Sequence, residues 1–354
     1  MKTSRFMVSG MGHLLFAAHL TPLANPRFAL YEILMTENAL FAPATGPLTI
    51  ALFVLPQASI LEVASALDPL RNANRQLGHE AYRWRVVTPD GQPVPLTCGI
   101  ELPSAGPLSH ASGADALIVI AGYRLAEVAT RPLIRDLRRI APRFQLVGGI
   151  DAAPWVMARA GLLDGYRATV HWEDLEDLAA SHPETTVLPD RYVIDRNRAT
   201  IGGAAAATDF MLHLIRARHG AALARQVAAS FLATHRKGSE PQIAPEAQDP
   251  SLDPRVARAT ALMEATLDAP QPIASIAKAV NLTPRRLETL FRDSLGLTPG
   301  AYALSLRLAA ARRLLTDTKH PLAEIALRTG FSSPATLSRA FKAKFGHPPG
   351  SLRA

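Results

Sequence analysis

The sequence has one cysteine, Cys98, among its 354 residues. A single cysteine excludes an internal disulfide framework and suits a reducing cytoplasm. No stretch approaches 18 uncharged apolar residues, so the sequence predicts no membrane span. The eleven histidines form neither an HExxH motif nor a cluster with cysteine, which argues against a metal site. These absences predict a cytoplasmic protein without a bound metal or cofactor.

The first part of the chain, residues 1–46, shows no periodic pattern. Basic residues precede the stretch GMGHLLFAAHL, as in a signal peptide, but His13 and His19 interrupt its apolar run. We expect residues 1–46 to be a disordered extension, or an upstream start wrongly included, with Met35 as the true first residue.

Positive charge is concentrated at the other end of the chain. The net charge is +8, and residues 252–354 hold 15 basic and 7 acidic side chains, so the excess lies entirely there. Such a charge distribution is typical of a domain that neutralises nucleic-acid phosphates.

The same pattern occurs twice in this basic part, over Ile273–Tyr302 and over Leu322–Leu352. Each copy predicts a helix, a tight turn that Asn281 or Gly330 can form, and a second helix. A helix-turn-helix of this kind places its second helix in the DNA major groove. The repeated positions are Thr283, Pro284, Leu287, Phe291, Gly296 and Pro299 in the first copy and Ser333, Pro334, Leu337, Phe341, Gly346 and Pro349 in the second.

The pair of units resembles the DNA-binding domain of the AraC/XylS family of bacterial transcription regulators. The resemblance is carried by LxxLFRxxLGLTPxxY, the joining LRLxxARRLL and IAxxxGFSSPATLSRAFKxKFGHPP. It implies that double-stranded DNA is a partner, whereas a plain helical bundle that binds no DNA is the alternative.

The recognition helices should meet DNA with the face opposite their apolar residues, among them Leu287, Leu290 and Phe291. One protomer should then read two adjacent groove segments, because a continuous helix over Tyr302–Leu315 joins the units. The predicted groove-facing residues are Arg285, Glu288 and Thr289 in the first helix and Ser333, Pro334, Ala335, Thr336 and Arg339 in the second. The predicted phosphate contacts are Arg286, Arg292, Lys342 and Lys344.

Strand and helix patterns alternate from Leu48 to Thr234, and they predict an α/β doubly wound, mostly parallel sheet. The expected fold is this domain followed by an all-α domain with two helix-turn-helix units. The expected boundaries are a first domain over 47–234, a linker over 235–254 and a DNA-binding domain over 255–354. The strand-like runs are 48–56, 82–88, 116–122 and 144–150, a hairpin covers 185–201, and the helical patterns are 60–77, 132–140, 153–160, 172–181, 204–218 and 221–234.

The stretch GGIDAAPWVMARAGLLDG, residues 148–165, has the layout of a nucleophile elbow. A strand ends at Ile150, Asp151 occupies a sharp turn, and a helix follows at once. The stretch resembles the class I glutamine amidotransferase-like domain of intracellular proteases. With DPLRNANRQLG, YRWRVVTPDGQPV, AGLLDGYRATVHWEDL and FMLHLIRARHG, it resembles more closely the sensor domain of GlxA-type AraC regulators.

Enzymes of that superfamily carry a cysteine at the elbow, where this chain has Asp151. Cys98 lies in PLTCGIELP, away from any elbow, and is predicted to be a small buried hydrophobe. His171 matches the superfamily's histidine position but has no thiol to activate. We therefore predict no catalytic residue and a pocket that is used for sensing.

The predicted ligand site centres on Asp151, whose carboxylate the following helix should keep ionised. Glu62 matches the superfamily's acidic position, and two converging carboxylates need a cation or a proton between them. Trp155 and Trp172 could supply aromatic faces for a quaternary ammonium group. The resemblance implies amino acids or quaternary amines such as betaine and carnitine, held by Asp151 with help from Glu62 and His171. The alternative is that Asp151 only caps its helix, Glu62 is solvated and both tryptophans are core residues.

The sequence thus predicts a transcriptional regulator that responds to a small-molecule effector, as a homodimer at the bacterial nucleoid with RNA polymerase as a further candidate partner. An amidohydrolase or hydratase-like enzyme fused to a DNA-binding domain is the chief alternative. A constitutive DNA-binding protein with an inactive first domain is the third. The acidic stretch EDLED, residues 173–177, is predicted to be the solvated face of a helix.

Overall fold

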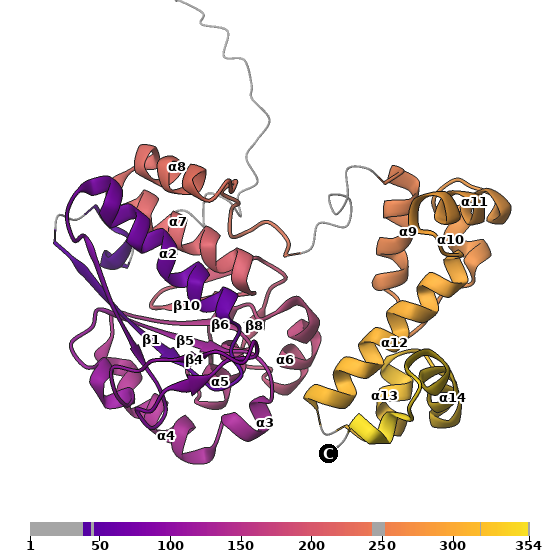
Figure 1. The fold of residues 1–354 in the computed structure, drawn as a ribbon, viewed down its shortest axis with the longest axis horizontal. Coiled ribbons are helices and arrows are strands. Elements are labelled where there is room, and N and C mark those ends of the chain that lie inside the picture. Colours follow the sequence, from indigo (N-terminus) through magenta and orange to yellow (C-terminus); the bar gives the residue numbers. More distant parts are fainter. Residues whose placement is uncertain (1–37, 44–45, 243–251, 319, 353–354) are drawn as a thin grey trace, which may run out of the picture.

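The computed structural model describes residues 38–43, 46–242, 252–318 and 320–352. An α/β domain is followed by a smaller helical domain, and the two lie side by side in Figure 1. No helix among these described residues is long and apolar enough to cross a membrane.

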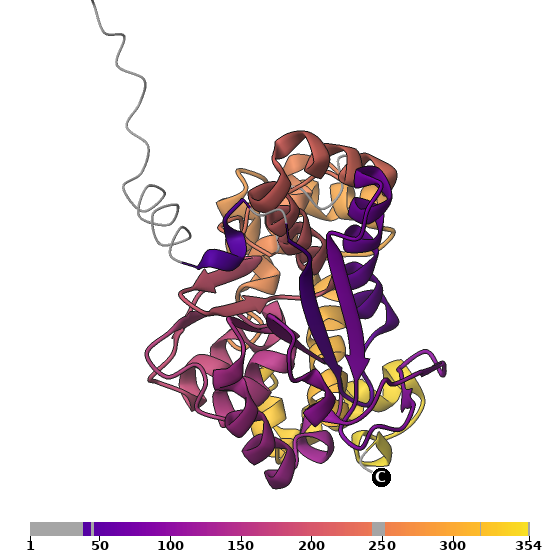
Figure 2. The same ribbon diagram turned by 90° about the vertical axis from the view of Figure 1, so that its left-hand side faces the viewer.

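The α/β domain is built on a six-stranded sheet with the order β2-β1-β5-β6-β10-β9. Neighbouring strands are parallel except for the antiparallel pair β10–β9, which is the predicted hairpin. The mostly parallel sheet is therefore confirmed, and Figure 2 shows it. Its strands are β1 (Leu48–Val54), β2 (Tyr82–Val87), β5 (Ala116–Ala121), β6 (Leu146–Asp151), β9 (Tyr192–Asp195) and β10 (Arg198–Ile201). Short pairs are β3 (Val94–Pro95) with β4 (Glu101–Leu102) and β7 (Arg167–Ala168) with β8 (Thr186–Val187).

Helices cover both faces of this sheet, so strands such as β5 are buried along their whole length. One layer consists of α2 (Ile60–Leu77), α7 (Ala204–His219) and α8 (Ala221–Ser230). The opposite layer consists of α3 (Leu125–Val128), α4 (Arg131–Ile140), α5 (Ala153–Arg159) and α6 (Leu175–Ser181). Each layer has its own apolar core against the sheet.

Part of the predicted N-terminal extension belongs to this domain. Leu40 and Phe41, in a short 3-10 helix over Ala39–Phe41, are buried in the core beside α7. The side chain of Asn38 caps this helix and donates hydrogen bonds to the carbonyl oxygens of Gln145 and Arg196. The expectation of disorder is therefore wrong for this segment, because it buries apolar side chains. Residues 1–37 lie outside the described part of the chain.

The first part of the predicted linker also contacts the α/β domain, and we call residues 235–242 the strap. Arg191 in the domain donates its backbone N–H to the carbonyl oxygens of Gly238 and Glu240 in the strap. The amide of Gln242 donates to Thr169 Oγ1 and to the carbonyl oxygens of Val170 and Asp190, at 2.7–3.0 Å. The rest of the predicted linker, up to residue 251, lies outside the described residues.

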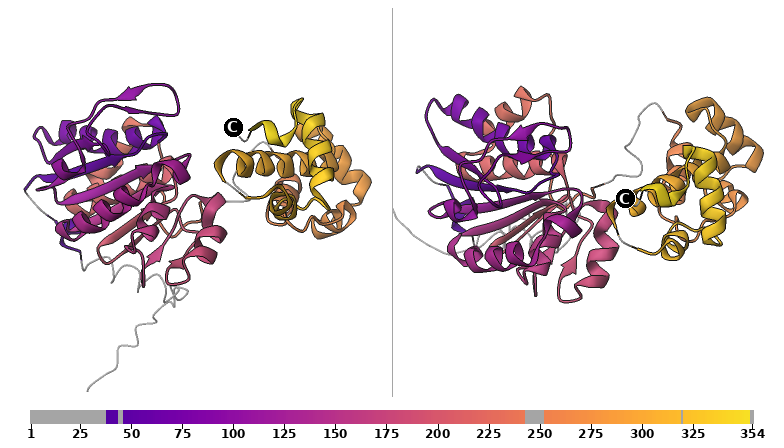
Figure 3. Two further views of the ribbon diagram at one scale, coloured as in Figure 1. Left: turned by 90° about the horizontal axis from the view of Figure 1, so that it is seen from below. Right: turned by 60° about the horizontal axis from the view of Figure 1, so that its bottom comes forward.

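The helical domain contains both predicted helix-turn-helix units, α10–α11 and α13–α14, joined by the single long helix α12. Thr283 and Ser333 cap the recognition helices, since their side-chain oxygens accept the N–H groups of Arg286 and Thr336. The predicted left-handed stops are confirmed by φ angles of 57° at Asn281 and 68° at Gly330. Figure 3 gives two further views of this domain. Its helices are α9 (Pro254–Glu264), α10 (Ile273–Ala279), α11 (Pro284–Leu295), α12 (Pro299–Asp317), α13 (Leu322–Arg328) and α14 (Pro334–Phe345).

Candidate functional site

The predicted elbow is present at the end of β6. Asp151 has a φ of 62°, a backbone conformation that is uncommon for a residue other than glycine. The N–H of Ala152 donates to the carbonyl oxygen of Ala121 at 2.9 Å and so anchors the turn to β5. α5 begins at Ala153. A strained backbone of this kind often marks a functional site, because surrounding contacts must hold it in place.

A cavity of about 870 Å³ opens above this elbow, and all five predicted ligand residues line it. Gly122 and Gly203 leave space beside the elbow carboxylate: a Cβ on Gly203 would stand 3.6 Å from His171 Cδ2 and 4.0 Å from Asp151 Oδ1. The cavity lies where β5, β6 and β10 end, the usual location of ligands in open parallel sheets. The five residues are Glu62, Asp151, Trp155, His171 and Trp172.

Glu62 and Asp151 form a buried acid pair in this cavity. Glu62 is 5% exposed and lies in the first turn of α2, where one of its oxygens accepts the N–H of Ser59 at 3.4 Å. Burial and the neighbouring Asp151 carboxylate raise the pKa of Glu62 to about 9. The hydrogen bond between the two side chains favours the ionised form of Asp151 and the neutral form of Glu62. Between about pH 7 and pH 9 the pair therefore holds one proton, which resides on Glu62.

The helix dipole does not keep Asp151 as acidic as the sequence led us to expect. Burial raises the pKa of Asp151 to about 7, and the negative charges of Asp174 and Glu173 add to this rise. The backbone N–H of Ala152 and the hydrogen bond from Glu62 lower it only in part. α5 is a single short helix of 7 residues, and its dipole is too weak to offset burial.

His171 and Trp172 lie side by side next to the elbow. The backbone N–H of His171 donates to the carbonyl oxygen of Asp151 at 3.2 Å. The centroid of the His171 ring is 5.8 Å from that of the Trp172 ring. Burial and the charge of Arg313 lower the pKa of His171 to about 4, so the ring is neutral at physiological pH. Trp172 is 43% exposed, so the alternative in which it is a core residue is wrong. Trp155 is half-buried and packs edge-on against His182.

The helical domain also lines the cavity, which the sequence did not predict. Gln242 of the strap and four residues after α11, namely Arg313, Thr318, His320 and Arg328, complete its wall. Arg313 on α12 lies 3.1 Å from Glu173 and 3.5 Å from Asp174, and Arg328 on α13 pairs with Asp177. The interpretation of residues 173–177 as a solvated helix face is therefore wrong. No motif marks these arginines, because their role depends on how the two domains meet.

The only thiol of the chain lies away from this cavity. Cys98 is exposed rather than buried, because the loop after Leu96 turns it outward, and it does not line the cavity. Within the described part of the chain, no group of three or more His, Cys, Asp and Glu side chains could hold a metal ion.

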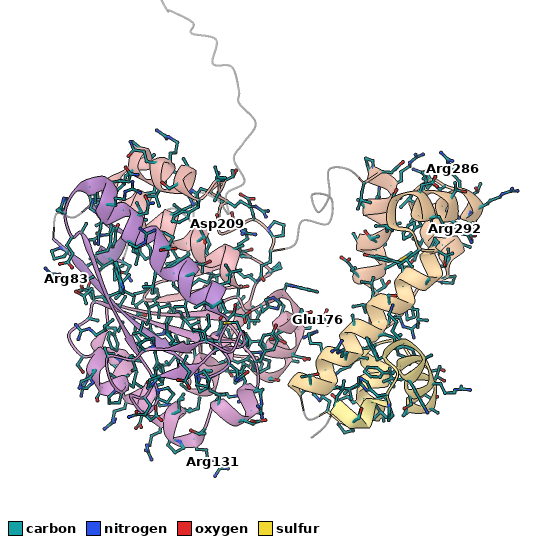
Figure 4. All side chains as sticks on the ribbon, viewed as in Figure 1. Arg83, Arg131, Glu176, Asp209, Arg286 and Arg292 are labelled. Atoms are coloured by element: carbon teal, nitrogen blue, oxygen red, sulfur yellow. The ribbon has the colours of Figure 1, made fainter. Side chains whose placement is uncertain are left out.

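The predicted DNA-contacting face is solvent-accessible on both recognition helices. Leu287, Leu290 and Phe291 are buried, as expected, so the opposite face of α11 is free to meet a groove. Figure 4 shows Arg286 and Arg292 at the end of the helical domain that is remote from the α/β domain. The exposed residues are Arg285, Arg286, Thr289 and Arg292 on α11 and Pro334, Ala335, Arg339, Lys342 and Lys344 on α14, while Glu288, Ser333 and Thr336 are half-buried.

Comparison with known proteins assigns both domains. The DJ-1/PfpI family matches residues 48–217, and a helix-turn-helix domain family matches residues 276–354. The HTH-type transcriptional regulator GbdR of Pseudomonas aeruginosa is 35% identical to this chain, over 86% of this chain and 83% of its own. The HTH-type transcriptional regulator CdhR of the same organism is 37% identical, over 85% of this chain and 90% of its own. The regulator GlxA of Rhizobium meliloti is 34% identical, over 83% of this chain and 92% of its own. The chain therefore belongs to the AraC-type helix-turn-helix transcriptional regulators that carry a DJ-1/PfpI domain, the GlxA-like group.

Proposed function

We propose that the protein regulates transcription in response to a cationic or zwitterionic nitrogen compound, which binds without chemical conversion above Asp151. The observation that carries this proposal is the buried acid pair Glu62–Asp151 in a cavity with aromatic walls. Its net negative charge favours a ligand with a positive group, and Trp155 and Trp172 can offer ring faces to a methylated ammonium. Arginines of the same cavity could receive a carboxylate at the other end of such a ligand.

An enzymatic role receives less support from this site. The elbow residue is a carboxylate rather than a thiol, and the exposed Cys98 lies outside the cavity. His171 is neutral but has no nucleophile to activate. The proposal therefore treats the elbow as a binding position, with Asp151 as the principal ligand contact and Glu62 and His171 as supporting contacts.

On the DNA side, we propose that each protomer reads two neighbouring major-groove segments with α11 and α14. A homodimer would then recognise a pair of such double sites. Sedimentation of the full chain tests the dimer independently of DNA.

The decisive experiment compares Asp151→Asn with wild type. A thermal-shift screen of amino acids and quaternary amines first identifies a stabilising compound, and a promoter–reporter assay then measures induction by it. Asp151→Asn should lose the thermal shift and the induction, yet bind DNA from the protein's own promoter region as tightly as wild type. Asp164→Asn, an exposed residue outside the cavity, is the matched control.

The positive charge of the proposed ligand predicts how its affinity depends on pH. Because a bound cation favours ionised Asp151, whose free pKa is raised to about 7, the affinity should increase from pH 6 to pH 8. An effector that binds more tightly at pH 6, or that stabilises Asp151→Asn as well as wild type, would contradict the proposed ligand class.

A further inference from the structure

The acidic segment, which we define as residues 173–177, is the surface on which the second helix-turn-helix unit rests. Arg313 reaches it from α12: its Nε lies 3.1 Å from Glu173 Oε1 and its Nη1 lies 3.5 Å from Asp174 Oδ1. Arg328, at the end of α13, pairs with Asp177 through Nη1 and with Glu324 through Nη2 at 3.0 Å. Two helices of the DNA-binding domain are thus attached to one short stretch of the α/β domain.

These contacts are stronger than ordinary surface ion pairs, yet they are open to competition. The Arg313, Glu173 and Asp174 side chains are only 26–30% exposed, so water screens their charges less than at a free surface. The buried Nε of Arg313 nevertheless has no aligned hydrogen bond, although it lies within ion-pair distance of Glu173. This nitrogen is attracted to the Glu173 carboxylate without an aligned hydrogen bond, so another cation can compete for that carboxylate.

The acidic segment is also part of the effector cavity. It directly follows His171 and Trp172, and the Asp174 N–H donates to the carbonyl oxygen of His171 at 2.8 Å. The charges of Glu173 and Asp174 act on Asp151, and the charge of Arg313 acts on His171. A positive ligand group beside Asp151 would be attracted by the carboxylates that hold Arg313 and would repel Arg313 itself.

We infer that a cation bound above Asp151 competes with Arg313 for Glu173 and Asp174 and thereby releases the second helix-turn-helix unit from the α/β domain. This inference rests on the proposed function for the ligand class, but the docking itself does not. The effector would thus replace one positive charge by another. The docked arrangement is held by the guanidinium of Arg313, and the released arrangement forms when the ligand cation takes its place. Differential binding of this kind is what a ligand needs to shift a two-state equilibrium.

The test measures energy transfer within full-length protein. One dye is placed on Cys98, which is the sole cysteine of the chain and exposed, and the other on Asp293→Cys, an exposed position of α11. Labelled protein is diluted into an excess of unlabelled protein, so that transfer between protomers does not contribute. Docked molecules give a narrow distribution of transfer efficiency, and released molecules give a broad one.

The first arm uses variants without ligand. Arg313→Glu should lower the ratio of docked to released molecules by about tenfold or more, since it places like charges opposite each other. Arg313→Gln should lower it less, and the double variant Arg313→Glu with Glu173→Arg should restore much of it. Arg312→Glu and Glu176→Gln, exposed neighbours on α12 and on the acidic segment, should leave the distribution unchanged. A wild-type distribution in Arg313→Glu would overturn the docking.

The second arm adds glycine betaine or tetramethylammonium chloride, with sodium chloride at equal ionic strength as the control. A probe that binds by calorimetry should broaden the distribution of wild-type protein, and sodium chloride should not. If a probe binds through Asp151 and the narrow distribution persists, the release is wrong and the proposed function stands. If Asp151→Asn still binds the probe and still opens, the release stands and the Asp151 assignment is wrong. Binding of neither probe would overturn the competition, while the first arm still decides the docking.

Discussion

The acid pair in the cavity gives the most specific prediction about stability, through the variant Glu62→Gln. Glutamine has the shape of protonated glutamate: its amide oxygen can accept the N–H of Ser59, and its NH₂ group can donate to Asp151. The substitution therefore keeps the two contacts of Glu62 in the folded protein. It removes only the proton that Glu62 must hold there.

The size of the effect follows from linkage between folding and protonation. The pKa of Glu62 rises from 4.5 to about 9 on folding, so between these values the folded state binds a proton that the unfolded chain has released. The contribution of protonated Glu62 to the free energy of unfolding is fully present below pH 4.5. It decreases as the pH rises towards 9, by up to about 1.4 kcal/mol per pH unit. The interval from pH 4.5 to pH 8 sets an upper limit of about 5 kcal/mol. Relaxation of the site reduces this to about 1–2 kcal/mol.

Urea unfolding followed by tryptophan fluorescence measures this effect in the right domain, because the three tryptophans, Trp84, Trp155 and Trp172, all lie in the α/β domain. The free energy of unfolding of Glu62→Gln should exceed that of wild type by about 1–2 kcal/mol at pH 8, and the difference should nearly vanish at pH 5. Asp68→Asn, a half-exposed position on the same helix, should follow the wild-type profile. A constant difference between Glu62→Gln and wild type at both pH values, or a less stable variant at pH 8, would refute the protonated pair.

Three other outcomes are expected. Arg285→Ala or Arg339→Ala should weaken binding to the native operator by about 1–3 kcal/mol and relax base preference at one position, so unchanged affinity in both would show that the groove face is misplaced. Footprinting should give two protected segments per protomer about one helical turn, or ~34 Å, apart, and a single half-turn would contradict the double reading. Gly149→Ala should lower the free energy of unfolding of the α/β domain by about 1–3 kcal/mol, because the new Cβ would stand 2.7 Å from Met157 Sδ and 3.1 Å from Pro154 N. A denaturant midpoint equal to that of wild type would contradict this.

The sequence was most informative where structure depends on local chemistry. Thr283 and Ser333 mark helix starts by their own hydroxyl groups, and Asn281 and Gly330 mark the left-handed stops between helices. Apolar runs of strand length located the central strands, since strands covered on both faces have few polar residues. Each of these signals lies within a few residues of the feature that it predicts.

The contacts between the domains could not be read in the same way. Glu173, Asp174 and Asp177 looked like a solvated helix face because sequence reveals their charge but not the arginines opposite them, which follow more than a hundred residues later. The ionisation of Asp151 was misjudged for a related reason. Its pKa depends on burial and on charges from other elements, whereas the sequence shows only the helix that follows it.

The strap has a practical consequence for anyone who would rebuild this regulator as a biosensor. Asp209 accepts hydrogen bonds from the side chain of Arg191 and from the backbone N–H of Arg236, so it ties the start of the strap to the domain interior. The amide of Gln242 occupies the space above Gly202, inside the cavity wall. We propose that a chimera in which the chain is cut at residue 234 would lose part of the cavity wall together with the DNA-binding domain. A graft that retains residues through Gln242 would keep this part of the wall and would lose only the side chains that the helical domain contributes, namely Arg313, Thr318, His320 and Arg328.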